Sequence, residues 1–252
     1  MVYGLWQSAA GLQVQEYRQA IIANNLANAD TPGFKADRIA FRERLNAATV
    51  RGEMRARNPV LDQMTGGLFE TPVYTDFAQG ALVPSNNPLD LAIDGDGFLT
   101  VRTKEGLRYT RDGRLAMNAD GMLVHAASGR AVLSTDGQPI VVDPTSRDPV
   151  KVDDSGQVRQ GDHIAGRLAL VDFADRRQIE KTGENLYASD GQKPVEGRGR
   201  IRQSAYEASS VEPASVLVDL ISASRAYEAN AKLITLQDDS LSRVVNELGR
   251  VG

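Results

Sequence analysis

The sequence contains no cysteine among its 252 residues. Disulfide bonds, iron–sulfur clusters, thiolate zinc sites and cysteine nucleophiles are therefore excluded together. Histidine is almost as scarce, since only His125 and His163 are present, and neither belongs to a His-x-x-x-His or Glu-x-x-His pair. The sequence thus predicts no metal ion and no other cofactor.

Long apolar runs are also missing. No run of 18 apolar residues occurs, so we expect no bilayer-spanning segment and no direct membrane insertion. The first fourteen residues, MVYGLWQSAAGLQV, lack the basic region and the unbroken apolar region of a secretory signal peptide. We therefore expect no cleaved leader.

An excess of positive charge is absent as well. The 29 Lys and Arg residues face 33 Asp and Glu residues, which is too balanced for a protein that neutralises phosphates along a duplex. Basic residues gather at 35–57 and 198–202, but without the interleaved aromatic residues that stack on bases. We interpret both stretches as solvated faces or protein interfaces and predict no nucleic-acid partner; nucleic-acid binding is the alternative for them.

Two segments carry a helical pattern. Residues 3–28 lack proline, and Asp30-Thr31-Pro32-Gly33 then marks a tight turn. From Pro213 to about Gly249, apolar residues recur at steps of three and four, which predicts a helix of about 35 residues, roughly 50 Å long. The predicted apolar seam consists of Leu5, Leu12, Ile22 and Leu26 in the first helix and Leu217, Leu220, Tyr227, Ile234, Leu241, Val245 and Leu248 in the second.

The chain between these segments has the period of β strands. Short apolar runs such as 89–93, 98–101, 115–117, 122–124 and 140–142 alternate with Asp-Gly dipeptides, which favour tight hairpin turns. We therefore predict an antiparallel meander, with further strands at 166–173 and 201–206. Residues 50–80, rich in Gly, Pro and Arg, have no clean period and are interpreted as a linker or extended loop.

Catalytic chemistry finds no support in the motifs. Asp90, Asp94 and Asp96 lack the ligand spacing of an EF-hand and are interpreted as turn residues. Neither a Gly-x-Ser-x-Gly elbow nor a phosphate-binding glycine loop occurs. We predict no catalytic residue and no small-molecule substrate; a β-domain binding module or hydrolase that uses the Asp-rich turns is the alternative from another class.

Four strings nevertheless point to one family. Residues 23–35 read ANNLANADTPGFK, residues 89–98 read LDLAIDGDGF, residues 109–113 read YTRDG, and residues 225–228 read RAYE. In this order they resemble the bacterial flagellar rod and hook proteins. The motif residues that carry the resemblance at the two ends are Asn24, Asn25, Leu26, Asn28, Pro32, Gly33, Phe34, Arg225, Tyr227 and Glu228.

The resemblance implies an α+β fold. Residues 1–35 and 207–252 would form a discontinuous axial domain in which the terminal helices pair as a coiled coil. Residues 36–80 would be an extended connector, and residues 81–206 an antiparallel β-rich outer domain. The seam residues above would then be the assembly interface.

The same resemblance implies a structural role. The chain would be a subunit of the flagellar basal-body rod, the axial drive shaft that transmits torque, in the periplasm-spanning part of the basal body. Its partners would be copies of itself, other rod proteins and the type III export apparatus, which exports such proteins without cleavage. The lack of cysteine suits this oxidising destination.

The ending of the chain looks most like the proximal-rod protein of the hook-like subgroup, with the distal-rod protein as the alternative. One position departs from the family. Ser209-Ser210-Val211 stands where Ser-Asn-Val is usual. Since both residue types offer a short side-chain oxygen, we expect the entry to the last helix to be preserved.

Overall fold

The structure is a computed structural model that describes residues 2–39, 41–43, 68–70 and 73–248. The chain divides into two compact units. The first comprises the described parts of 1–27, 37–74 and 212–252, and the second comprises 28–36 and 75–211. Residues 28–36 and 207–211 thus belong to the second unit, and these limits differ from the predicted domain limits at residues 35 and 207.

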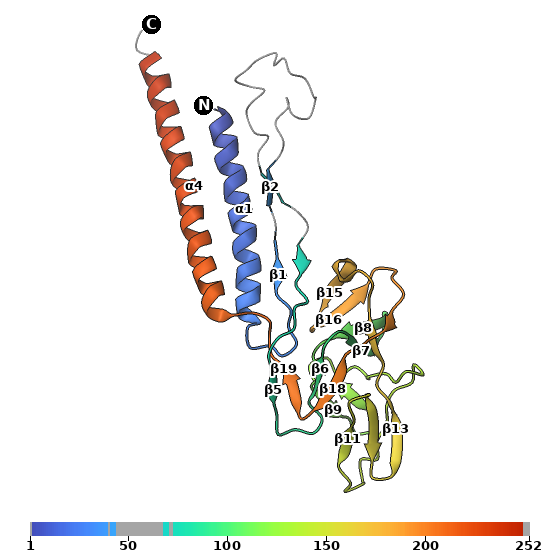
Figure 1. Ribbon diagram of the computed structural model, residues 1–252. Coiled ribbons are helices and arrows are strands. Elements are labelled where there is room, and N and C mark those ends of the chain that lie inside the picture. Colours follow the sequence, from blue (N-terminus) through green and yellow to red (C-terminus); the bar gives the residue numbers. More distant parts are fainter. Residues whose placement is uncertain (1, 40, 44–67, 71–72, 249–252) are drawn as a thin grey trace. The chain divides into compact units, whose positions relative to one another are not determined.

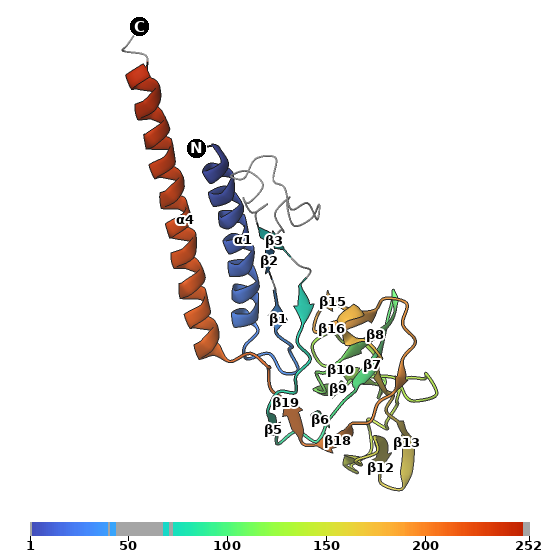
Figure 2. The same ribbon diagram turned by 45° about the horizontal axis from the view of Figure 1, so that its top comes forward.

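Two long helices make up most of the first unit. Helix α1 spans Val2–Ala27, and helix α4 spans Pro213–Leu248 over 36 residues. Pro213 opens α4, where its missing N–H is not needed by the helix. The helices lie side by side and run in opposite directions (Figures 1 and 2). Both helices predicted from the sequence are confirmed.

Short strand pairs complete the first unit. Strand β2 (Phe41–Glu43) pairs antiparallel with β3 (Leu68–Glu70), and β1 (Asp37–Arg38) pairs with β4 (Tyr74–Thr75). These strands belong to the predicted connector 36–80. Residues 40, 44–67, 71 and 72 of that connector lie outside the described residues.

The second unit is rich in short strands. Its largest sheet has six strands in the order β15-β16-β8-β7-β14-β17, all paired antiparallel. A short 3-10 helix, η1 (Arg176–Gln178), precedes β15 and is capped by the Asp175 side chain. The six strands are β7 (Phe98–Thr103), β8 (Gly106–Thr110), β14 (Leu170–Asp172), β15 (Ile179–Gly183), β16 (Leu186–Ser189) and β17 (Val195–Glu196).

Smaller antiparallel sheets join the rest of this unit. Strands β11, β12 and β13 form a meander, β9 pairs with β10, and the late strands β18 and β19 return to pair with the early strands β6 and β5. Their bounds are β5 (Leu82–Pro84), β6 (Leu91–Asp94), β9 (Leu115–Met117), β10 (Leu123–His125), β11 (Val150–Val152), β12 (Gln157–Gln160), β13 (His163–Arg167), β18 (Arg200–Gln203) and β19 (Ala205–Glu207).

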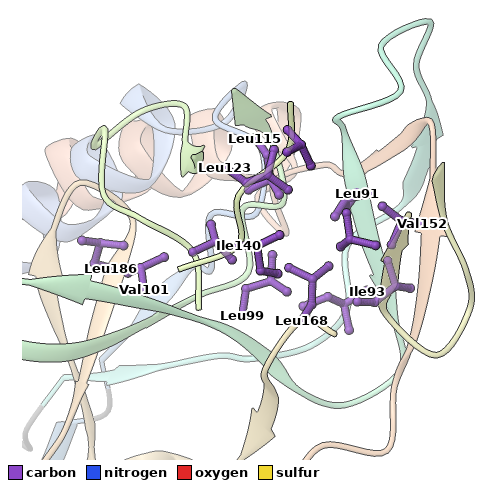
Figure 3. Packing of buried hydrophobic residues seen from close by; sticks show 14 residues of the cluster. Leu91, Ile93, Leu99, Val101, Leu115, Leu123, Ile140, Val152, Leu168 and Leu186 are labelled. Atoms are coloured by element: carbon purple, nitrogen blue, oxygen red, sulfur yellow. The ribbon is translucent and has the colours of Figure 1, made fainter. Parts of the chain in front are cut away.

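A single large apolar cluster forms the core of the β-rich unit. In Figure 3, Leu99, Ile140 and Leu168 lie in the middle of this cluster. Burial of each such side chain contributes about 1.5–3 kcal/mol to stability. The members are Leu91, Ile93, Leu99, Val101, Leu115, Leu123, Val132, Ile140, Val142, Val152, Val158, Leu168, Leu186 and Ile201.

Aromatic rings form a second cluster in the same unit. Tyr109 meets Phe173 edge to face, with ring centroids 4.7 Å apart, and Phe98 lies 5.9 Å from both Phe173 and Tyr187. Phe77 closes the cluster at 5.4 Å from Phe98. Such pairs add about 0.5–1.5 kcal/mol beyond the area they bury.

The predicted α+β class is confirmed, but several details of the strand prediction are wrong. The predicted strand 166–173 is divided between β13 and β14, and the predicted strand 201–206 is divided between β18 and β19. Residues 140–142 form no strand, and Val141 makes only an isolated bridge to Met122. Asp112-Gly113 is no hairpin turn, because the flanking strands β8 and β9 do not pair with each other. A Cβ at Gly113 would lie 1.8 Å from the carbonyl oxygen of Leu91. Glycine is needed there for the close approach of two backbone segments.

Candidate functional site

Helices α1 and α4 are held in a definite antiparallel register. A Cβ added at Gly4 would lie 2.9 Å from Nε2 of Gln237, and one added at Gly11 would lie 3.2 Å from Nδ2 of Asn230. The two glycines are seven residues apart, and so are the two amide side chains. Arg18 lies farther along α1, where its guanidinium is 3.9 Å from Asp219.

The face that α4 buries differs from the predicted seam. Ala223 is fully buried, and Asn230 and Gln237 meet the α1 glycines, so small and polar side chains share this face with apolar ones. The predicted seam on α4 starts at Leu217 and consists of apolar residues, so Asn230 and Gln237 are not among its members. The buried and half-buried positions at heptad spacing are Val216, Leu220, Ala223, Asn230, Ile234, Gln237 and Leu241.

The predicted interface residues accordingly fall into two groups. Ile22 is buried at 9% exposure, and the half-buried residues are Leu5, Leu12, Leu26, Leu220, Ile234 and Leu241. Three others are exposed: Leu217, Tyr227 and Val245. The Leu248 side chain lies outside the described residues. The role of all eleven in assembly stays a prediction.

Helix α4 exposes other large apolar side chains besides those of Leu217 and Val245. Leu217 and Ile221 are one helical turn apart, with Val218 beside them, and Leu233 lies one turn from Leu236. Monomeric soluble proteins seldom expose adjacent large apolar groups on a folded helix, and such groups mark sites of protein contact. We call this set the exposed apolar residues of α4: Leu217, Val218, Ile221, Leu233, Leu236, Val244 and Val245.

The turn that follows α1, residues 28–36, is built into the β-rich unit. Gly33 adopts φ +69° and donates its N–H to the carbonyl oxygen of Glu207 at 2.7 Å. A Cβ at this position would lie 2.5 Å from the backbone nitrogen of Asp112, so glycine is required for both conformation and space. Phe34 is buried, and the Lys181 ammonium lies 4.1 Å from its ring centroid.

Three buried charges fasten this turn. Lys35 and Glu207 have no exposed side-chain surface, and their Nζ and Oε1 atoms lie 2.5 Å apart. Nζ of Lys35 also donates to the carbonyl oxygen of Ala78, and the backbone N–H of Gly80 donates to Oε1 of Glu207. Arg111, only 1% exposed, brings its guanidinium to 3.6 Å from the second oxygen of Glu207.

The Glu207 carboxylate is therefore the counter-ion of both Lys35 and Arg111. Burial lowers the pKa of Lys35 and that of Arg111, and the charge of Glu207 opposes both shifts. Removal of Glu207 would leave two like charges in a site of low dielectric constant, where an unpaired charge is strongly destabilising. The carboxylate is thus the central member of the cluster.

A second buried network surrounds Asp112. Its carboxylate accepts from both Nε and a terminal nitrogen of Arg114, at 3.0 and 2.8 Å, and lies 3.4 Å from Nε2 of His125. Burial acts to raise the pKa of Asp112, but His125 and Arg114 outweigh it and hold that pKa below its usual range. Nδ1 of His125 lies 2.8 Å from the Ser128 hydroxyl.

This network does not have the geometry of a hydrolase. In a catalytic triad the serine contacts Nε2 of the histidine and the acid contacts Nδ1. Here the serine lies at Nδ1 and the acid at Nε2, and the acid also accepts a hydrogen bond from Arg114. Among the described residues, no group of three or more His, Asp or Glu side chains could hold a metal ion. No described helix is long and apolar enough to cross a membrane.

Comparison with known families covers three parts of the chain. Residues 8–35 match the family described as flagella basal body rod protein, and residues 92–160 match the flagellar hook protein FlgE/F/G D1 domain. Residues 202–248 match the C-terminal family of flagellar basal body rod FlgEFG proteins.

Whole-length relatives agree with these matches. The flagellar basal-body rod protein FlgF of Caulobacter vibrioides is 37% identical over 236 residues, which cover 92% of this chain and 91% of the relative. The chain belongs to the family of flagellar basal-body rod and hook proteins. FlgG of Buchnera aphidicola is 31% identical, covering 97% of this chain and 99% of its own, and FlgG of Bacillus subtilis is 29% identical, covering 98% and 99%.

Membership decides the class of function. As a member of this family, the rod protein is a structural subunit of the basal-body rod and not an enzyme. Its place is therefore the flagellar basal body.

The motif residues of the rod protein have different structural roles. The Asn25 amide, 7% exposed, accepts from the N–H of Asp37 and donates to its carbonyl oxygen, as a paired strand would. Asn28 accepts from the Thr31 hydroxyl, and Pro32 accepts from Asn185. The remaining motif side chains of α1 are the exposed Asn24 and the half-buried Leu26, and those of α4, Arg225, Tyr227 and Glu228, are exposed.

Ser210, where the resemblance leads us to expect asparagine, holds the turn. Its hydroxyl accepts from the backbone N–H of Ala36 at 2.9 Å, and its N–H donates to the carbonyl oxygen of Phe34. It therefore fixes the 28–36 turn rather than capping α4. An asparagine oxygen could accept the same hydrogen bond.

The buried charges of the rod protein escaped the sequence analysis. Lys35 was grouped with the basic stretch 35–57 and interpreted as part of a solvated face or a protein interface, which is wrong because it is fully buried. Arg198, Arg200 and Arg202 are exposed, as a solvated face requires. The only sequence signal for the buried site was the position of Lys35 at the end of the Thr-Pro-Gly-Phe turn.

Proposed function

We propose that α1 and α4 act as a coiled-coil pair through which the rod protein polymerises into the axial drive shaft. The observation that carries this proposal is the heptad pattern of α4, from Val216 to Leu241, set antiparallel against α1. Both helices are long, 26 and 36 residues, and their shared seam is narrow. A pair of this kind supplies axial stiffness once neighbours cover its remaining faces.

The assembly interface would then consist of side chains that the pair itself leaves uncovered. Leu217, Tyr227 and Val245 belong to the predicted interface and are exposed. We propose that they contact copies of this chain and other rod proteins. Leu220, Ile234 and Leu241 are half-buried on the seam side and would instead hold the pair together.

Aspartate substitutions separate these two roles. Leu217→Asp and Val245→Asp are expected to leave the purified monomer folded but to prevent its recovery in isolated basal bodies, because a charge cannot be buried unpaired in the interface. Ser242→Asp, an exposed change on the same helix, is the control and should assemble normally. Wild-type incorporation and motility of both leucine and valine variants would contradict the proposed interface.

The division of labour between the two units follows from the same proposal. The axial domain comprises the terminal helices, assigned from the sequence to 1–35 and 207–252, and the β-rich domain faces outward. The second unit supports this division because it buries its own apolar core. Electron microscopy of basal bodies with a tag inserted at the β7–β8 turn, Lys104–Glu105, should place the tag at an outer radius.

Export is proposed to use the flagellar type III apparatus, with passage into the periplasm-spanning rod and no cleavage. Deletion of the first twenty residues should stop both export and assembly, because it removes most of α1. The intact mass of the protein from basal bodies checks the lack of cleavage. A mass that lacks an N-terminal segment would contradict the export route.

Within the family, we propose an FlgF-type subunit in the proximal rod, with the distal rod as the alternative. Identity supports this choice, since the FlgF relative reaches 37% and the two FlgG relatives above reach 31% and 29%. Expression in strains that lack either protein tests it. Rescue of motility only in the strain without FlgF is the expected result, and rescue only in the strain without FlgG would reverse the assignment.

A further inference from the structure

The α1–α4 seam contains two amide side chains at positions where a coiled coil would be most stable with leucine. Asn230 and Gln237 are seven residues apart on α4, and each lies against a glycine of α1. Oε1 of Gln237 is buried, and within the described part of the chain it has no hydrogen-bond partner. A buried acceptor without a partner is destabilising. The amide therefore needs a reason other than stability.

The glycines supply the complementary shape. At Gly11 an added Cβ would lie 3.2–3.3 Å from three atoms of the Asn230 amide, and at Gly4 it would lie 2.9 Å from the Gln237 nitrogen. Any larger residue at these positions would push the amides away. Each glycine and amide thus fit together only when they face each other.

We propose that these two glycine–amide matches set the register of the helix pair. Since both spacings are seven residues, the native register makes both matches. A slip of one heptad, about 10 Å along the axis, keeps a single match and sets the other amide against a different residue. A single polar residue on a coiled-coil seam is known to fix register at a cost in stability.

This inference deepens the proposed function and rests on it in one respect: a fixed register gives the exposed apolar residues of α4 constant positions relative to α1. The test itself uses the isolated full chain and does not need assembly. Failure of the proposed function would appear as a normal register without incorporation into basal bodies.

The experiment measures the register directly. Because the chain has no cysteine, spin labels can be attached at Ala9→Cys and Ser240→Cys, which are both exposed, and the distance between them recorded by pulsed electron resonance. This labelled parent is compared with the same chain carrying Asn230→Leu and Gln237→Leu. Asn246→Leu, an exposed change of the same type on the same helix, is the matched control.

The parent and the control should show one narrow distance. The double leucine variant should add a second population at a different distance, because a slip of one heptad moves one label by about 10 Å along the axis relative to the other. The thermal midpoint of its helical signal should stay equal or rise. A single narrow distance in the double variant would overturn the proposal. So would a lower thermal midpoint, because the amides would then contribute stability rather than register.

A second pair of variants tests the glycine side. Gly11→Val should shift or broaden the distance although both amides are present, whereas Ala20→Val, at an exposed position of α1, should not. An unchanged narrow distance in Gly11→Val would show that shape at this glycine has no part in the register.

Discussion

The helix pair and the β-rich unit distribute their apolar side chains in opposite ways. The β-rich unit buries fourteen aliphatic residues in one cluster, each at 8% exposure or less. Helix α4 exposes seven large aliphatic side chains while it directs Asn230 and Gln237 toward α1. One unit thus has a core of its own, and the other carries much of its apolar surface outside.

The different burial of apolar side chains indicates where each unit obtains its stability. Burial of the central cluster suffices for the β-rich unit in the free chain. The helix pair has a partly polar seam and an exposed apolar surface on α4, so covering that surface would add to its stability. On the proposed function, assembly would therefore stabilise the helix pair more than the β-rich unit.

The largest expected effect concerns the buried charges of the β-rich unit. Glu207→Gln leaves Lys35 and Arg111 without their shared carboxylate, and should lower the free energy of unfolding by about 3–5 kcal/mol. Denaturant titration of the free chain measures this loss. Glu180→Gln, at an exposed position of β15, is the control and should change it by less than about 0.5 kcal/mol. Equal effects of the two changes would refute a central role for Glu207.

The comparison of cores is tested by one substitution in each unit. Leu99→Ala removes a fully buried side chain and should lower the free energy of unfolding by about 2–5 kcal/mol. Leu236→Ala removes a side chain that is 54% exposed and should change it by no more than about 0.5 kcal/mol. The amount of folded protein recovered in basal bodies should show the opposite order, because the Leu236 variant should be impaired in assembly. If Leu236→Ala unfolds the free chain, α4 is already covered before assembly.

Acid should destabilise the protein through protonation of Asp112. Its folded-state pKa lies below the value of about 3.9 expected in the unfolded chain, so the unfolded chain binds the proton first as pH falls. The stability that this carboxylate contributes is present above pH 4 and is lost as pH falls through the folded-state pKa. Thermal midpoints between pH 7 and pH 3 should therefore fall less steeply for Asp112→Asn than for the parent.

The residual slope in that variant has its own sources. The pKa values of Asp143, Asp153 and Asp172 are also lowered. Hydrogen bonds from neighbouring hydroxyl groups lower those of Asp143 and Asp153, and the pKa of Asp172 is lowered although burial opposes the shift. Parallel curves for the parent and Asp112→Asn would show that protonation of Asp112 does not contribute to the loss of stability in acid.

The smallest effect is expected at Ser210. Ser210→Ala removes the acceptor for the N–H of Ala36 and should cost about 1 kcal/mol. Ser210→Asn restores an acceptor and should remain within about 0.5 kcal/mol of the parent. Thermal midpoints of the two variants decide the matter, and a more damaging Asn than Ala would show that the pocket fits serine alone.

Much of the fold was predictable because it depends on local signals. The helices follow from the absence of proline in 3–28 and from the steps of three and four after Pro213, and strands β6, β7, β9 and β10 follow from alternation between Asp-Gly dipeptides. Asp112-Gly113 shows the limit of such signals. The dipeptide is typical of a hairpin turn, but the backbone of Leu91, a segment distant in sequence, packs directly against it.

The candidate site was harder to predict because it depends on pairs distant in sequence. Nothing near Lys35 indicates that Glu207, 172 residues away, will neutralise it in a dry site. The face of α4 that meets α1 was hard to predict for a related reason. Apolar residues at 217 and 245 fit a stripe equally well, and only the glycines of α1 reveal that Asn230 and Gln237 face inward.

The separation of Lys35 and Glu207 has a consequence for timing. Strands β18 and β19, which pair with β6 and β5, and the carboxylate that neutralises Lys35 all come from residues 200–207. At about 5–20 residues per second, a ribosome makes Glu207 roughly ten to thirty-five seconds after Lys35. Throughout that interval the β-rich unit lacks its closing strands and its counter-ion. The β-rich unit of the nascent chain therefore stays unfinished until synthesis is nearly over.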